Sequence, residues 1–223
     1  MDWVALWLSV RLAAATSAVL VAIGVPLAYW IVFSPRRWKF LVEAIVALPL
    51  VLPPTVLGFY VLIAIGPLSP FGRLFARAAG HALPFTFEGL LIASVLYSLP
   101  FAVQPFSTEF ASVDRRLLEA SWSLGVSRPS TFRRVVLPLS VRGLVAGIVL
   151  SFAHTLGEFG VVLMVGGNVP GVTRTISISI YDAVQSLDYS AAARTSLFLL
   201  VISFLILAST YALQRSIWVR PRR

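Results

Sequence analysis

The fold class that the sequence predicts is an all-α polytopic membrane protein, and three observations support it. Of the 223 residues, 58% are hydrophobic and 12% are charged, which is more apolar surface than a soluble domain of this length can bury. Five apolar runs are long enough to cross a bilayer as helices. Arginine-rich segments separate several of these runs, the linkers are short, and no internal repeat is visible. We therefore expect a single membrane domain over residues 1–223.

The N-terminus carries Asp2 and no basic stretch, which favours a retained first span over a cleaved signal peptide. Several prolines lie inside the spans and are expected to kink or break them. The pair Pro53–Pro54 bends the second span, either for helix packing or to line a cavity. The first span is extended outward by Trp3 to Val10. The five spans cover roughly Leu12 to Phe33, Ala44 to Gly66, Gly89 to Ser107, Gly143 to Val165 and Thr195 to Gln214.

Lys and Arg residues are distributed unequally between the two sides of this layout, with thirteen on one side and five on the other. Because cytoplasmic loops are enriched in Lys and Arg, the richer side is predicted to be cytoplasmic, with the N-terminus outside and the C-terminus inside. The same bias accounts for the net charge of +9 without a nucleic-acid partner. The thirteen residues are Arg36, Arg37, Lys39, Arg115, Arg116, Arg128, Arg133, Arg134, Arg142, Arg215, Arg220, Arg222 and Arg223.

A polar, arginine-rich segment separates the third and fourth spans. Asp114 is the predicted N-cap of a helix over Arg115–Leu124, which Gly125 terminates in the left-handed conformation. Pro129 suits the first turn of a second short helix that ends before Pro138. On physical grounds alone, this segment is either a docking surface for a partner protein or an amphipathic loop held on anionic lipid headgroups.

Polar residues interrupt the fourth span, where Ser151, His154 and Glu158 fall at helical spacing on one face, with Thr155 beside them. Ionisable residues inside a membrane are costly and normally face a bundle interior or a wet cavity. His154 and Glu158 either satisfy each other and lock neighbouring helices, or line such a cavity. A proton relay is a weaker reading, because no other span carries a central acid or base. Its negative charge disfavours Glu158 as a direct ligand for an anion.

The segment that follows, residues 166–189, is predicted to hold a short amphipathic helix near the outer surface, capped by Thr173. Arg174 together with the helix N-terminus favours an oxyanion ligand. Alternatively, Arg174 anchors the membrane interface. The apolar face of this helix is predicted from residues at helical spacing, which are Ile176, Ile180, Val184 and Leu187.

The motif E-A-x-x-x-x-G, followed nine residues later by V-V-L-P, resembles the EAA loop of ATP-binding-cassette (ABC) importer permeases. Ser121 replaces the usual third-position alanine, and Val135 replaces an isoleucine. The resemblance implies a type I importer transmembrane domain with five membrane helices per protomer and coupling helices between the third and fourth spans. It also implies contact with a separate ATPase through Glu119, Ala120, Ser121, Gly125, Leu137 and Pro138.

Most of the chain is similar to permease subunits of bacterial molybdate importers. The resemblance rests on three segments, which are L-P-L-V-L-P-P-T-V-L-G from Leu48, S-F-A-H-T-L-G-E-F-G from Ser151, and G-G-N-V-P-G-V-T-R-T from Gly166. The E-F-G and G-N-x-P elements also resemble sulfate permeases, while P-G-x-T-R-T and Ile180–Tyr181–Asp182 favour molybdate. The candidate pathway or gate residues are Ser151, His154, Glu158, Asn168, Thr173 and Arg174.

The resemblance implies a homodimer in the bacterial cytoplasmic membrane that moves molybdate, with tungstate as a second candidate, by alternating access. An extracytoplasmic oxyanion-binding protein would deliver the anion, and a cytoplasmic ATPase dimer would bind ATP-Mg. The alternatives are a sulfate or thiosulfate permease, and less favourably a stand-alone anion channel or secondary transporter. An enzyme is disfavoured because Walker A, HExxH and GxSxG motifs and cysteines are missing and His81 stands alone. No cofactor or metal site is expected in this chain.

Overall fold

The computed structural model describes residues 1–218, and every regular element in that range is helical. Three helices are each long and apolar enough to cross a membrane, and the number rises to five if two bent pairs each count as one span. The helices are α1 Trp3–Phe33, α2 Lys39–Ala47, η1 Leu48–Leu50, α3 Pro54–Ile65, α4 Pro70–Ala79, α5 Phe87–Ser112, α6 Arg115–Ser123, α7 Arg128–Thr131, η2 Phe132–Val136, α8 Leu137–Leu139, α9 Val141–Gly157, α10 Gly160–Gly166, α11 Ile176–Gln185 and α12 Tyr189–Trp218.

The predicted second span is broken in two. The segments Lys39–Leu50 and Pro54–Ile65 are each too short to cross a membrane alone, and together they form a pair bent by 113°. Pro53 has extended backbone and caps α3, and Pro54 occupies the first helical turn, where a missing N–H costs nothing. The sequence therefore located this bend correctly, although the segment turns far more sharply than a kinked span would.

The predicted fourth span, Gly143 to Val165, is also interrupted, so the prediction of one continuous helix was wrong. Helix α9 ends at Gly157, Glu158 has extended backbone (φ −66°, ψ 135°), and α10 begins at Gly160. The two breaks meet in space, because a Cβ added to Gly160 would lie 2.7 Å from Cβ of Pro54. The short helices α3 and α10 then pack against each other.

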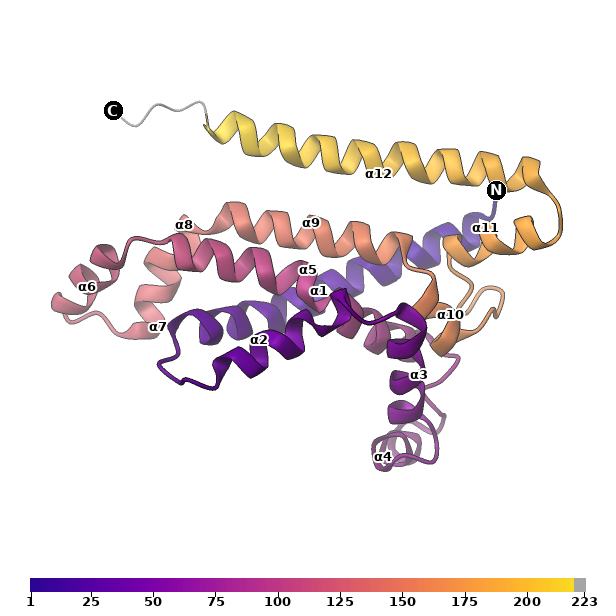
Figure 1. Ribbon diagram of the computed structural model, residues 1–223, viewed down its shortest axis with the longest axis horizontal. Coiled ribbons are helices and arrows are strands. Elements are labelled where there is room, and N and C mark those ends of the chain that lie inside the picture. The colour runs from indigo at the N-terminus through magenta and orange to yellow at the C-terminus, as the bar shows by residue number, and fades with distance from the viewer. Residues whose placement is uncertain (219–223) are drawn as a thin grey trace.

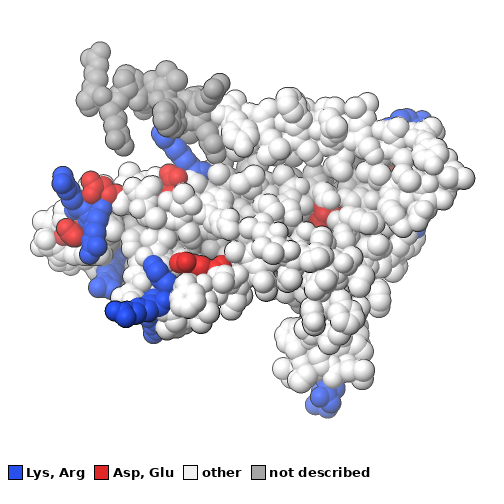
Figure 2. Space-filling view, in the orientation of Figure 1, with Lys and Arg blue, Asp and Glu red and all other residues white. Residues whose placement is uncertain are grey.

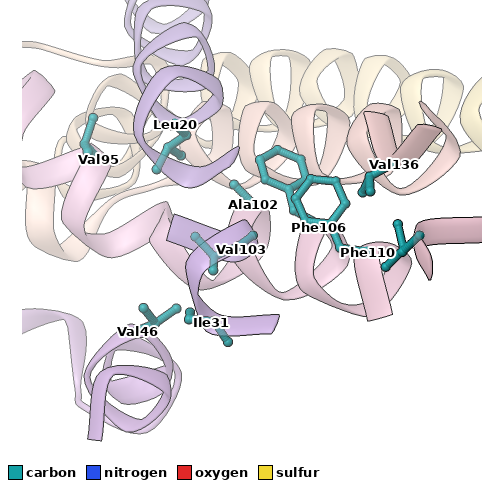
Figure 3. Close-up of a cluster of buried hydrophobic side chains, with 11 residues drawn as sticks. Leu20, Ile31, Val46, Val95, Ala102, Val103, Phe106, Phe110 and Val136 are labelled. Carbon is teal, nitrogen blue, oxygen red and sulfur yellow. The ribbon is translucent and has the colours of Figure 1, made fainter. Parts of the chain in front are cut away.

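Helices α1, α5 and α9 form the core of the bundle. On α9, small residues recur every fourth position, so the backbone approaches its neighbours closely. A Cβ on Gly147 would lie 2.5 Å from Cε1 of Phe106, and one on Gly143 would lie 2.4 Å from Cβ of Glu109. Figure 3 shows Phe106 and Phe110 of α5 within the main cluster of buried side chains. The stripe on α9 is Gly143, Gly147, Ser151 and Thr155.

Figures 1 and 2 show that the charged side chains gather at the end of the bundle where α5 leads into α6. Helices α1 and α5 run toward the end of the molecule that carries α6 and α7, α9 returns from it, and the N-terminus lies at the other end. Most of the visible Lys, Arg, Asp and Glu atoms gather at the α6 and α7 end, and the body between is largely uncharged. Of the thirteen basic residues predicted on this side, Arg220, Arg222 and Arg223 lie outside the described residues.

Helix α12 lies along α9 on the outside of the bundle (Figure 1). In the most apolar stretch of α12 only 11% of the residues are buried, whereas the corresponding share in α5 is 56%. Its exposed apolar side chains include Leu200 and Phe204. An apolar surface of this size is stable in lipid or against another subunit, which agrees with a membrane protein.

Candidate functional site

The segment between α5 and α9, residues 114–139, forms a projecting elbow of short helices (Figure 1). The Asp114 carboxylate accepts a hydrogen bond from the Arg116 N–H at 2.9 Å, which confirms the predicted N-cap of α6. Gly125 has φ +77°, which confirms the predicted left-handed residue after the helix. Leu118 is buried, whereas Leu124 beside the turn is 82% exposed. The elbow therefore anchors one apolar side chain and presents another at its tip.

The second half of the elbow differs from the prediction. Pro129 lies in the first turn of α7, as expected. The helical path does not end before Pro138, however, because it continues through the π-helical turn η2 and into α8. Pro138 is tolerated in the first turn of α8, where its missing N–H has no intrahelical partner to lose.

Most of the predicted coupling residues are accessible on this elbow. Glu119 is exposed and pairs with Arg115 one turn earlier, with 3.1 Å between Oε1 and Nε. The Ser121 and Thr131 hydroxyls lie 2.9 Å apart and join α6 to α7. Ala120, Gly125 and Pro138 are exposed, and Leu137 is half-buried.

A cavity of about 570 Å³ lies between α6 and the ends of α1 and α5. Aromatic side chains line it, and the Arg128 guanidinium lies 5.6 Å from the centroid of the Trp122 ring. Because of this space, α6 is held to the bundle mainly through buried Leu118 and the hydroxyl pair with α7. The aromatic lining consists of Tyr29, Phe33, Phe110, Trp122 and Phe132.

Within the bundle, His154 is bound to α5. A hydrogen bond joins His154 Nδ1 to Ser98 Oγ at 3.0 Å, and Ser98 also bonds to Thr155 at 2.9 Å. The imidazole stacks on the Phe101 ring at 3.9 Å and lies 4.8 Å from the Tyr97 ring. The prediction that His154 and Glu158 satisfy each other was therefore wrong, because the helix ends between them.

Glu158 lies in the break between α9 and α10 and is only 4% exposed. Neither of its carboxylate oxygens has a hydrogen-bond partner among the residues that the structure describes. Ser151, by contrast, has hydrogen-bond partners. The Ser151 hydroxyl is buried, donates to the Ile148 carbonyl at 3.0 Å and lies 3.4 Å from the Ser17 hydroxyl of α1. Ser151 thus belongs to the packing stripe of α9.

At the end of the molecule opposite the elbow, the predicted residues Asn168 and Arg174 form a hydrogen-bonded network with Asp182. The Asn168 amide donates to both carboxylate oxygens of Asp182, at 2.8 and 2.7 Å. Arg174 Nε donates to Asn168 Oδ1 at 2.6 Å, and its Nη2 lies 3.5 Å from Asp182 Oδ2. Sequence reasoning missed Asp182 as the partner of Arg174. This network ties the loop before α11 to the helix itself.

Thr173 does not cap α11, contrary to the prediction. Its hydroxyl donates to the Gly166 carbonyl at 2.6 Å and accepts the Val169 N–H at 3.1 Å, so it stabilises the preceding loop. The helix begins at Ile176, whose N–H donates to Ser9 Oγ of α1 at 2.8 Å. The predicted short helix is confirmed, but its buried face agrees with the prediction only at Ile176 and at the half-buried Ile180. Ile176 and Ile178 are buried, because α11 packs on the bundle through its first turn, whereas Val184 and Leu187 are exposed.

The chain is a helical bundle with interrupted spans and a projecting charged elbow, as expected of a polytopic membrane protein. The model for the family described as "Binding-protein-dependent transport system inner membrane component" matches residues 21–220. The chain belongs to this family.

Among solved structures the chain is similar to the MetNI methionine ABC transporter, with a TM-score of 0.73, 17% identity and coverage of 96% of this chain and 94% of that one. A bacterial ABC transporter involved in import of alginate gives a TM-score of 0.71, 18% identity and coverage of 94% and 79%. The chain thus has the fold of ABC importer permeases.

Curated relatives cover nearly the whole chain. It is 45% identical to the molybdenum transport system permease protein ModB of Azotobacter vinelandii over 96% of this chain and 95% of that protein. The putative molybdenum transport system permease protein YvgM of Bacillus subtilis is 36% identical, over 90% and 88%. ModB of Escherichia coli K12 is 33% identical, over 92% and 91%.

Proposed function

We propose that this chain is the membrane permease of an ATP-driven importer of molybdate, with tungstate as an alternative cargo. The observation that carries the proposal is 45% identity, along nearly the full length, to a molybdenum transport permease. The 36% and 33% identical relatives bear the same description. Residues 1–223 would form one permease domain. Sulfate is a less favoured cargo, because none of these three relatives is described as a sulfate permease.

The energy for transport would come from outside this chain. Its sequence contains no Walker A glycine–lysine motif, so ATP-Mg would bind to a cytoplasmic ATPase dimer. Two copies of the permease would enclose the path, and an extracytoplasmic binding protein would deliver the anion. Delivery by a binding protein is supported by one similar solved structure, a bacterial alginate ABC transporter in complex with an alginate-bound periplasmic protein.

The elbow would receive the force of ATP binding. Its location supports this role, because the elbow projects from the end where charged side chains gather, away from the largely uncharged body (Figure 2). In this orientation the N-terminus faces outward and the C-terminus lies in the cytoplasm. The proposed coupling residues are Glu119, Ala120, Ser121, Gly125, Leu137 and Pro138.

Among the candidate gate residues, His154 is the best placed to control passage. It is half-buried and joins α9 to α5 by a hydrogen bond and a ring stack, so relative movement of the two helices would break both contacts. Glu158 would act through the break between α9 and α10. Asn168 and Arg174 would hold the outer loop, whereas Thr173 and Ser151 would act through packing.

Uptake by the reconstituted complex tests the proposal. The permease and its ATPase are placed in vesicles with the binding protein, and ATP-dependent uptake of radiolabelled molybdate is measured with tungstate or sulfate as competitor. We expect tungstate to compete and sulfate to compete weakly. Stronger competition by sulfate than by tungstate would assign the sulfate function instead, and uptake without the ATPase would contradict the importer.

A further inference from the structure

Two polar side chains on α5 are exposed in the half of this span nearest the elbow. Gln104 and Thr108 lie one helical turn apart, and both are exposed, although they belong to a helix that is long and apolar enough to cross a membrane. Polar side chains that face lipid in a membrane are costly, so such residues normally face a partner or a wet cavity. Their exposure therefore requires a neighbour other than hydrocarbon.

The same two residues form a ridge between two hollows. A cavity of about 520 Å³ lies on the α9 side of the ridge, with Glu109 and Arg142 at its wall. A second cavity of about 570 Å³ lies on the α2 side, with Lys39 and Glu43 at its wall. Each hollow thus combines polar groups of the ridge with one acidic and one basic side chain. Apolar side chains, among them Val46 and Val103, complete the wall on the α2 side. Charged groups beside such a surface are stable inside a membrane only where water or a partner reaches them.

Toward the other end of α5 the same helical stripe is covered. Tyr97, Phe101, Gln104 and Thr108 follow one another at spacings of three and four residues and so share one side of the helix. His154 of α9 covers the first two, with ring centroids 4.8 Å from Tyr97 and 3.9 Å from Phe101. The stripe is therefore half-buried beside His154 and exposed from Gln104 toward the elbow.

We propose that Gln104 and Thr108 line the inner half of the transport path, between the His154 constriction and the elbow side of the membrane. The identity of the cargo as an oxyanion rests on the function proposed above. The Gln104 amide and the Thr108 hydroxyl supply neutral N–H and O–H donors to its oxygens. Neutral donors suit a passage, because a site on the path must bind the ion weakly enough to release it.

Single cysteines test whether the ridge faces water. The natural chain has no cysteine, so each introduced thiol is the only one. Gln104→Cys and Thr108→Cys are compared in the assembled transporter with Ile23→Cys, at a 45% exposed apolar position in the middle of α1. Leu124→Cys at the elbow tip is the positive control for aqueous exposure. A hydrophilic, membrane-impermeant thiol reagent is applied from the elbow side, with and without tungstate.

We expect Gln104→Cys and Thr108→Cys to react, Ile23→Cys to remain unmodified, and tungstate to slow the two ridge reactions at least severalfold. No reaction at either ridge position in any nucleotide state overturns the proposal. Oxidative cross-linking of Gln104→Cys to its copy in a second permease, without labelling, also overturns it, because the ridge would then be a subunit contact.

Transport by substituted proteins gives the second readout. Gln104→Leu removes one donor to a charged ligand and is expected to lower molybdate uptake about tenfold, with ATP hydrolysis changed less than about twofold. Gln104→Asn and Thr108→Ser, which keep the donors, are expected to retain most uptake. Equal uptake by the Leu and Asn variants contradicts a role for the amide.

The two proposals fail separately. If the wild-type complex transports no molybdate but the ridge cysteines are modified and Ile23→Cys is not, the path assignment stands and the cargo is wrong, whether or not tungstate slows the reactions. If molybdate is transported but the ridge thiols behave like Ile23→Cys, the path assignment alone is wrong.

Discussion

The hydroxyls of Ser121 and Thr131 lie 2.9 Å apart, and this hydrogen bond joins the two short helices of the elbow. Thr131 is 2% exposed, so its hydroxyl depends on this partner. Because a cavity lies between α6 and the bundle, this bond helps α6 and α7 to move as one body.

The first prediction concerns this bond. Ser121→Ala leaves the buried Thr131 hydroxyl without a partner and is expected to destabilise the α6–α7 contact by about 1 kcal/mol. Faster hydrogen exchange of the α6 amides measures the loss. Ser123→Ala, at an exposed position on the same helix, is the matched control. If the two variants exchange alike, the hydroxyl pair contributes nothing to the elbow.

The second prediction concerns the turn at Gly125. A Cβ at this position meets no atom within 4 Å, so any cost of substitution comes from its φ of +77°. Gly125→Val is expected to cost about 1–2 kcal/mol in this conformation and to abolish uptake, while insertion and dimerisation persist. Gly125→Asn, which tolerates the left-handed region, should retain most uptake. Normal molybdate uptake by the Val variant would show that the turn geometry is not required.

The third prediction concerns the packing of α9 on α5. Gly147→Ala would bring a methyl group to 2.5 Å from Phe106 Cε1 and 2.9 Å from the Ala102 carbonyl oxygen. The resulting overpacking is expected to destabilise the protein by about 1–3 kcal/mol. Thermal unfolding in detergent measures it. Gly157→Ala is the control, because a Cβ there meets nothing within 4 Å. A melting temperature for Gly147→Ala as high as that of the control would argue against the close approach.

The fourth prediction separates two roles for Arg174. Since Arg174, Asn168 and Asp182 form one network, Arg174→Ala and Asp182→Ala should lower uptake by similar factors, and the double variant should lose no more than either. Uptake should fall more than ATP hydrolysis. Normal uptake by Asp182→Ala together with loss in Arg174→Ala would mean that the guanidinium contacts the anion itself. Equal loss of uptake and hydrolysis would indicate faulty assembly.

The sequence predicted well those features that local chemistry determines. Hydropathy located the spans, Asp114 and Gly125 marked the ends of α6, and Pro53–Pro54 marked the sharp bend before α3. In each case the residue type carries a backbone preference that neighbouring elements do not override.

Features that depend on tertiary contacts were not predictable in the same way. The break at Glu158 contains no proline, and helical spacing therefore suggested a pair between His154 and Glu158. Ser98, which lies 56 residues earlier in the chain, forms the hydrogen bond with the imidazole instead. Asp182 and Ser9 likewise acquire their partners only when distant segments meet. The four-residue repeat from Gly143 to Thr155 was the one visible signal of close packing that sequence reasoning did not use.

Cross-linking at the elbow tip tests the central claim most directly. Leu124→Cys and Leu68→Cys introduce thiols at two highly exposed leucines, 82% and 91% exposed, in loops on predicted opposite sides of the membrane. Each is treated with a short thiol–amine cross-linker in membranes that contain the co-expressed ATPase. We expect Leu124→Cys alone to cross-link to the ATPase, with a yield that depends on ATP. Cross-linking at Leu68→Cys instead, or labelling of Leu124→Cys only from the outside, would contradict the account.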